Sequence, residues 1–167
     1  SDPELVQEIE LPEDILTVFS YGDNVAMNNQ WLLIPYVQNA PARIMLAAYR
    51  NNGVEWIYDQ VVEIGLASIF AKTTSRAIAI EDRTVIMGNI ILELDAEGVW
   101  RKMYTLSPSD PEPMQIASDF SHWITNGSSF GQSVAISNNT IFIGAPTKDD
   151  GTTWDVGAIY VYTKKPW

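Results

Sequence analysis

The chain has 167 residues, a length that suits one domain with a buried core, and its 46% hydrophobic and 19% charged residues form an ordinary globular mixture. A formal net charge of −11 sets up a field that repels phosphate backbones and anionic lipids, and no apolar run approaches the roughly 20 residues that cross a bilayer, so we expect neither a nucleic-acid partner nor membrane insertion. The absence of cysteine excludes disulfides, thiol catalysis and cysteine-ligated zinc.

In chain order, the first predicted strand covers residues 5–11, and a hairpin pattern then occurs three times. Two apolar strands flank a polar tip in each copy, and the copies cover residues 24–35, 77–88 and 133–144. The tips contain residues that tolerate the positive φ of tight hairpins, namely Asn28-Asn29, Glu81-Asp82 and Asn138-Asn139. The corresponding residues Val25, Ile78 and Val134 are 53 and 56 residues apart, which is about the length of a four-stranded propeller blade.

Each copy continues with further apolar stretches that fit the outer part of a blade. Third strands are predicted at residues 44–49, 90–94 and 158–162, and fourth strands follow a turn that ends in glycine at residues 54–62 and 99–106. The third copy has no fourth strand before Trp167. We therefore predict one all-β domain over residues 1–167, a β-propeller of three four-stranded blade repeats at about residues 18–63, 70–106 and 129–167.

Parts of this repeat resemble a known family. Phe130-Gly131, Gly144-Ala145-Pro146 and the stretch 157–162 in the third copy resemble an FG-GAP repeat, the blade unit of integrin-α-type propellers and of many microbial and viral surface proteins. The other copies are degenerate: Tyr21-Gly22 stands in place of FG in the first, and the second keeps only Gly88. The resemblance implies a propeller used for adhesion or ligand binding, only rarely an enzyme, and favours an extracellular or surface location.

The small number of predicted blades indicates that the chain needs a partner to close a propeller ring. Propellers usually need about four to eight blades, so three blades leave an arc with two apolar end faces, and such faces are uncommon on monomers. Residues 5–11 precede the first copy at about the distance at which each fourth strand precedes the next copy. We expect a homodimeric six-bladed ring, in which this strand closes the third blade of the partner. A fragment of a longer propeller and a small three-bladed ring closed by its own strand are the alternatives.

Metal binding and catalysis have little support in the sequence. Integrin-type repeats often carry a calcium loop of pattern D-x-D-x-D-G between strands one and two, but the tips here are too short for it, so we predict no such metal site. The loop at residues 147–155 is interpreted as a solvated loop, with weak calcium binding left open. The lone His122 has no carboxylate or nucleophile at motif spacing, so we predict no enzyme and no cofactor.

Loop aromatics are the candidate ligand contacts. Tryptophans among Asp, Asn, Thr and Ser suit stacking on a sugar ring with nearby hydrogen bonding, although loop aromatics also cap core edges. The predicted ligand-binding residues are Trp154, Asp155, Asp149, Asp150 and Trp123. They favour a non-enzymatic binding or adhesion module with a glycan or protein ligand. The alternative is a structural or assembly protein, or a piece of a larger propeller, without a small ligand of its own.

Overall fold

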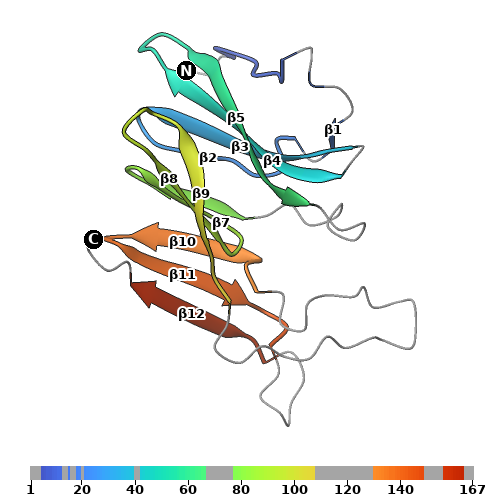
Figure 1. Cartoon of the computed structure of the whole chain (residues 1–167), viewed down its shortest axis with the longest axis vertical. Coiled ribbons are helices and arrows are strands. Elements are labelled where there is room, and N and C mark those ends of the chain that lie inside the picture. Colours follow the sequence, from blue (N-terminus) through green and yellow to red (C-terminus); the bar gives the residue numbers. More distant parts are fainter. Residues whose placement is uncertain are drawn as a thin grey trace.

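The computed structural model contains three antiparallel sheets that follow one another in chain order from one end of the molecule to the other (Figure 1). Among the residues that the structure describes there is no helix and there are twelve strands. The described residues are 5–12, 15, 18–19, 21–39, 42–66, 77–107, 130–148 and 156–163.

Sheet 1 is the largest of the three. Its strands are β1 (Val18–Phe19), β2 (Ala26–Met27), β3 (Trp31–Gln38), β4 (Arg43–Asn51) and β5 (Trp56–Leu66). The order is β1-β3-β4-β5, and β2 also pairs with β3. The short β1 and β2 therefore share one edge of β3. Of these two, β2 lies in the predicted first strand of the blade, and β1 is an additional short strand outside the predicted hairpin.

Sheets 2 and 3 are simpler meanders. Sheet 2 has the order β6-β7-β8-β9, with β6 (Ile78–Glu81), β7 (Thr84–Met87), β8 (Ile90–Leu94) and β9 (Trp100–Thr105). Sheet 3 has the order β10-β11-β12, with β10 (Ser133–Ser137), β11 (Thr140–Ala145) and β12 (Ala158–Thr163). Of the strands that the structure describes, β12 pairs with β11 alone.

The three predicted hairpins share one register. The pairs Ala26↔Leu33, Ala79↔Ile86 and Ala135↔Phe142 fall at corresponding positions of the three copies. Asn138 and Asn139 have φ values of 50° and 60°, as the two-residue tip requires. Two predicted tips were wrong by a residue. Glu81 still pairs with Thr84, so the second tip consists of Asp82 and Arg83. Asn28 N–H donates to the Trp31 carbonyl at 3.0 Å, so the first tip consists of Asn29 and Gln30.

The sheets stack face to face, and each contact between neighbouring sheets is an apolar core. We call the face that points to the next sheet in chain order the forward face and the opposite one the rear face. The core between sheets 1 and 2 joins buried residues Trp31, Leu33, Ile44, Leu46, Ala48 and Ile64 to Val85, Met87, Ile90, Leu92 and Trp100. The core between sheets 2 and 3 joins Ile86 to Ile141 and Ile143. This burial on both faces explains why the strands carry near-continuous apolar runs.

The rear face of sheet 1 is covered by the N-terminal part of the chain. Its buried residues are Leu32, Ile34, Tyr36, Met45, Ala47 and Tyr49, and Ile9, Leu11, Ile15, Val18, Tyr21 and Trp56 pack against them. Within the single chain, residues 5–12 form no strand, although residues 5–11 were predicted as one. Their role as a closing strand stays a prediction, as do the number of blades in the ring and the dimer. The all-β class with blade-like antiparallel sheets is confirmed.

Candidate functional site

The predicted ligand-binding residues Trp123, Asp149, Asp150, Trp154 and Asp155 lie outside the described residues, as does His122. The structure does define the base of the loop that contains four of them. Lys148 N–H donates to the Ala145 carbonyl at 3.2 Å, and Gly157 N–H donates to the Lys148 carbonyl at 2.9 Å. These bonds draw the two ends of the loop together between β11 and β12.

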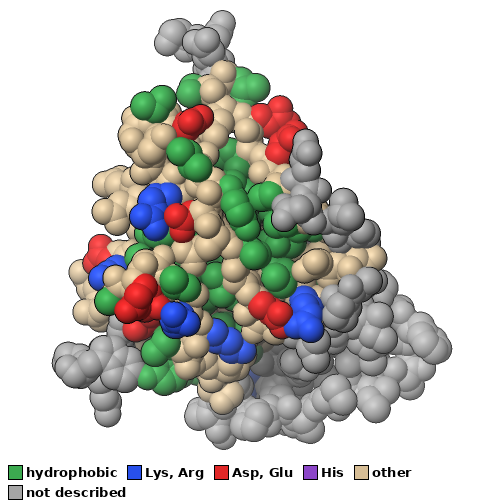
Figure 2. All heavy atoms as spheres, turned by 45° about the horizontal axis from the view of Figure 1, so that its top comes forward, with side chains coloured by type: hydrophobic (Ala, Val, Ile, Leu, Met, Phe, Trp, Pro, Cys, Tyr) green, Lys and Arg blue, Asp and Glu red, His purple; other side chains and the backbone are tan. Residues whose placement is uncertain are grey.

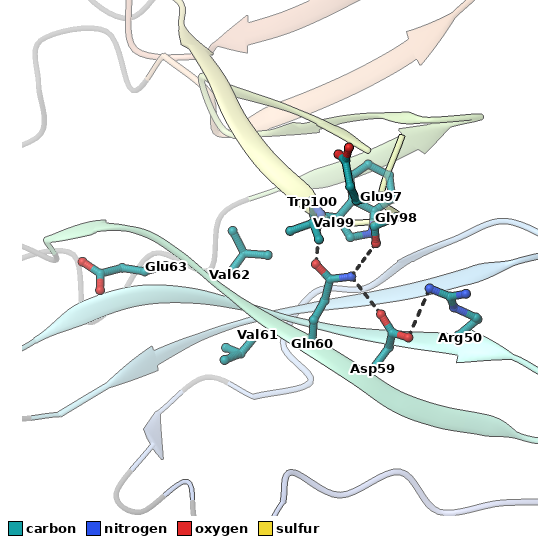
Figure 3. Close-up of a pocket in the computed structure, with 10 residues that line it drawn as sticks. All are labelled: Arg50, Asp59, Gln60, Val61, Val62, Glu63, Glu97, Gly98, Val99 and Trp100. Atoms are coloured by element: carbon teal, nitrogen blue, oxygen red, sulfur yellow. Dashed lines mark hydrogen bonds and ion pairs between the residues drawn. The ribbon is translucent and has the colours of Figure 1, made fainter. Parts of the chain in front are cut away.

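A cavity of about 490 Å³ lies at the rim between sheets 1 and 2 (Figure 3). Its walls come from β4 and β5 on one side and from the β8–β9 turn with the start of β9 on the other. Its lining residues are Arg50, Asp59, Gln60, Val61, Val62, Glu63, Glu97, Gly98, Val99 and Trp100. A volume of this size is within the usual range of small-ligand sites, and the lining mixes carboxylates with one guanidinium.

The side chain of Gln60 ties the two walls of this cavity together. Its Nε2 donates to the Gly98 carbonyl at 2.9 Å, and its Oε1 accepts from Trp100 N–H at 2.9 Å. The same Nε2 donates to Asp59 at 2.8 Å, and Asp59 forms an ion pair with Arg50 at 3.2 Å. Gln60 therefore holds the fourth strands of neighbouring sheets at a fixed spacing, and its polar atoms are already engaged within the protein.

Aromatic rings pack behind this bridge. Trp100 is buried and meets Trp31 edge to face with ring centroids 5.6 Å apart, and the Arg50 guanidinium lies 4.8 Å from the centre of the Trp31 ring. The indole Nε1 of Trp100 is buried without a hydrogen-bond partner. Trp100 is therefore a packing residue between sheets.

Charged side chains on the face shown in Figure 2 lie in mixed neighbourhoods, with acidic and basic groups beside one another and hydrophobic side chains exposed between them. The ion pairs Arg50–Asp59, Arg43–Glu63 and Arg101–Asp95 belong to the described part of the chain. The Val99 backbone N–H, with help from Arg101, holds the pKa of the Asp95 carboxyl below its usual range. This carboxylate thereby fixes the β8–β9 turn that forms one wall of the cavity.

A second surface of interest is the forward face of sheet 3, against which no other sheet of the described residues packs. Phe142, Ile159 and Val161 expose 40%, 73% and 58% of their surface, whereas Ile141 and Ile143 on the rear face are buried. Exposed apolar side chains that are contiguous across two paired strands usually mark an interaction site.

The N-terminal segment is attached to sheet 1 by polar contacts. Tyr21 and Tyr49 share a hydroxyl–hydroxyl hydrogen bond of 2.8 Å, and the Tyr49 hydroxyl donates to the Glu10 carbonyl at 3.0 Å. Burial raises the pKa of both phenols. Gln7 adds two bonds to the backbone of Trp56, one as donor at 2.9 Å and one as acceptor at 3.0 Å.

Neither a metal-binding cluster nor a membrane-spanning helix is present among the described residues. No three His, Cys, Asp or Glu side chains of this part of the chain lie close enough together to hold a metal ion. The same residues include no helix that could span a membrane.

The third copy of the repeat matches the model of a known protein family. The FG-GAP repeat model matches residues 124–162, which contain all of sheet 3 except the last residue of β12. The predicted resemblance is thus confirmed for this copy, and repeats of this kind typically build β-propellers that bind or adhere. No curated protein and no solved structure matches the chain.

Sequence reasoning missed the bridging role of Gln60 and Gln7. A single glutamine in a mixed strand carries no motif. The available signal was their position in the repeat, because the two residues are 53 apart, the same offset that relates Val25 to Ile78.

Proposed function

We propose that the chain is a non-enzymatic binding or adhesion module of the β-propeller type, acting outside the cell or at its surface. The observation that carries the proposal is the FG-GAP repeat at residues 124–162, together with its fold as a blade-like sheet. The cavity between sheets 1 and 2 is assigned a packing role, since Gln60 holds the two sheets together and the Asp59–Arg50 ion pair lies beside it within sheet 1.

The proposed ligand is a glycan or a protein surface, bound by the loop between β11 and β12. Trp154 would stack on a sugar ring or an apolar side chain, and Asp149, Asp150 and Asp155 would accept hydrogen bonds from hydroxyl groups. Trp123 is the proposed second aromatic contact. The backbone bonds at the base of the loop support this assignment, because a loop with fixed ends loses less conformational entropy when it binds. Weak calcium binding at this loop is proposed as an accessory, since its carboxylates are the oxygen ligands that calcium prefers.

The test is binding of the purified chain to a glycan array and to immobilised surface proteins, with and without calcium. We expect binding that Trp154→Ala abolishes. Val54→Ala is the control, because Val54 is exposed in the turn before β5 and far from the loop in sequence. Absence of binding to every glycan and surface protein would overturn the ligand part of the proposal. Equal binding by Trp154→Ala and the wild-type chain would overturn the assignment to this loop.

Self-assembly is the second part of the proposal, and the exposed forward face of sheet 3 favours it. A stack of sheets in which two contacts are apolar cores and the last face is open suits a protein that completes its ring with another copy. Under this proposal two copies form a six-bladed homodimer. If the ligand tests fail and assembly holds, a structural role without a small ligand is the better description.

A further inference from the structure

The contacts between neighbouring sheets repeat at two places, the tip of the first hairpin and the fourth strand. At the hairpin tips, Asn28 Nδ2 donates to the Asp82 carbonyl at 3.1 Å, and the Glu81 carboxylate accepts from the N–H groups of Asn138 and Asn139 at 2.8 and 3.2 Å. Asn28 and Glu81 are corresponding residues of the repeat, 53 positions apart. In sheets 1 and 2, the residue at this position of the repeat therefore contacts the hairpin tip of the next sheet.

At the rim, a glutamine forms the corresponding link. Gln60 on β5 bonds to the start of β9 in sheet 2, and Gln7 bonds in the same two-way manner to Trp56 at the start of β5 in sheet 1. Gln60 belongs to the fourth strand of sheet 1. Gln7 thus occupies the position that the fourth strand of a sheet preceding sheet 1 would occupy.

The residues that follow each glutamine agree with this correspondence. Val62 and Ile64 lie two and four residues after Gln60 and pack in the core against the rear face of sheet 2. Ile9 and Leu11 lie two and four residues after Gln7 and pack against the rear face of sheet 1. The segment 7–11 therefore repeats the sequence spacing, the polar bridge and the apolar contacts of β5.

The described residues contain no further strands that would make up this preceding sheet. Val25 and Met27 on the rear side of sheet 1 are exposed, whereas their counterparts Ile78 and Ile80 pack against the preceding sheet. Leu5, at the start of the segment, is also largely exposed. The rear face of sheet 1 thus carries the segment 7–11 in the place of a fourth strand, although this segment forms no strand within the single chain.

Sheet 3 has the complementary deficiency. It supplies strands one to three, its β12 has no second partner among the described strands, and its forward face is open. Ile159 and Val161 on this face correspond, through their pairing with β11, to Leu46 and Ala48 in sheet 1. Both of the latter are fully buried against sheet 2.

We propose that residues 5–11 of one copy form the fourth strand of sheet 3 in a second copy, and that the exchange is reciprocal. The inference rests on the proposed self-assembly and specifies the segment, the acceptor strand and the register. A second copy is the occupant because sheet 2 separates the segment from β12 within one chain, so that the two lie at opposite ends of the stack (Figure 1).

The register follows from sheet 1. There, Gln60 pairs with Ala48 and Val62 pairs with Leu46 on the third strand. Transferring these pairs to the corresponding residues places Gln7 opposite Val161 and Ile9 opposite Ile159, with the strands antiparallel.

Disulfide trapping tests this register directly, because the chain has no cysteine. We would combine Ile9→Cys with Ile159→Cys. Opposed residues of antiparallel strands have Cα atoms about 4.5–5.5 Å apart, within disulfide range. The matched control combines Ile9→Cys with Ala135→Cys, which lies on the same face but on β10, about 14 Å from the proposed strand.

The expected result is a covalent dimer of twice 18.6 kDa on a non-reducing gel for the first pair and none for the control. A solution dimer without this crosslink would overturn the strand exchange and leave the self-assembly standing. An internal disulfide in an 18.6 kDa chain would overturn it in favour of a ring closed within one chain, and a ladder of larger species would overturn the reciprocal exchange.

As a check on folding, Ile159→Asp changes only an exposed side chain, and we expect a monomer with an unchanged circular dichroism spectrum. A variant that remains dimeric would contradict the proposal.

Discussion

Corresponding positions on the forward faces of sheets 1 and 3 should respond very differently to the same truncation. Leu46 is fully buried between sheets 1 and 2, and its counterpart Ile159 is 73% exposed on the open face. Truncation of a buried leucine to alanine removes its transfer free energy and leaves a cavity, which together cost about 2.7–5 kcal/mol. We therefore expect Leu46→Ala to lower the free energy of unfolding by that amount.

The expected loss for Ile159→Ala is much smaller. Burying a whole isoleucine side chain is worth about 1.5–3 kcal/mol, and only about a quarter of Ile159 is covered in the single chain, which leaves at most about 0.4–0.8 kcal/mol. Guanidinium denaturation followed by tryptophan fluorescence measures both values, provided that the slope of the transition is unchanged. The comparison belongs at concentrations low enough to dissociate an assembly. At higher concentrations, Ile159→Ala should weaken assembly and Leu46→Ala should not.

Equal losses for the two variants at low concentration would refute the assignment of faces. A loss below about 0.5 kcal/mol for Leu46→Ala would do the same, because it falls in the range of surface substitutions. Either result would mean that sheets 1 and 2 do not pack through the core described here.

Three further predictions concern a glycine, the glutamine bridge and the tyrosine pair. Gly22→Ala should cost about 1–2 kcal/mol of stability, because alanine is strained at the positive φ of this residue. Gly131→Ala should cost more, since its Cβ would also lie 2.8 Å from the backbone of the β7–β8 turn. Thermal denaturation of the two variants compares their losses of stability. Gln60→Ala should cost about 1–3 kcal/mol in urea denaturation for the two lost bonds between the walls of the cavity. Gln60→Glu should cost at least as much, because its carboxylate would oppose the Gly98 carbonyl and the Asp59 carboxylate to which the amide donates. Folding raises the pKa of Tyr21 and Tyr49 above the usual value of about 10. The stability that the neutral pair contributes is therefore complete below that pH and is lost as the pH rises above it. A variant with Phe at both positions should lose less of its resistance to urea as the pH rises above about 10.

The repeat could be predicted from the sequence because each copy contains a complete local signal. Asn138 and Asn139 adopt the positive φ that tight hairpins need, and apolar strands flank them in a regular frame. The tip of the second copy was displaced by one residue for a reason that lies outside the hairpin. Glu81 looks like a turn residue, but its carboxylate accepts hydrogen bonds from the tip of the neighbouring sheet while its backbone stays in the strand.

Contacts between sheets explain other differences between the predicted and the observed strands. The strand predicted at residues 54–62 continues to Leu66 as β5, because Ile64 is buried against sheet 2. The additional strand β1 of sheet 1 has no sequence signal, since it is only two residues long. Local patterns do not describe such tertiary contacts.

The candidate site was harder to predict than the fold. Residue types alone indicated Trp154 and its acidic neighbours, which lie outside the described residues and remain predictions. The cavity at the sheet 1–sheet 2 rim depends on Gln60, a residue with no motif of its own. Its recurrence as Gln7 at the repeat spacing is visible in the sequence, but only the two bridges show what it means.

The molar mass of the wild-type chain in solution, measured by light scattering during size exclusion over a range of concentrations, tests most directly whether two copies complete one ring. We expect a mass of twice 18.6 kDa, with dissociation on dilution toward the single chain. A mass of 18.6 kDa at every concentration would contradict the claim that two copies complete one propeller.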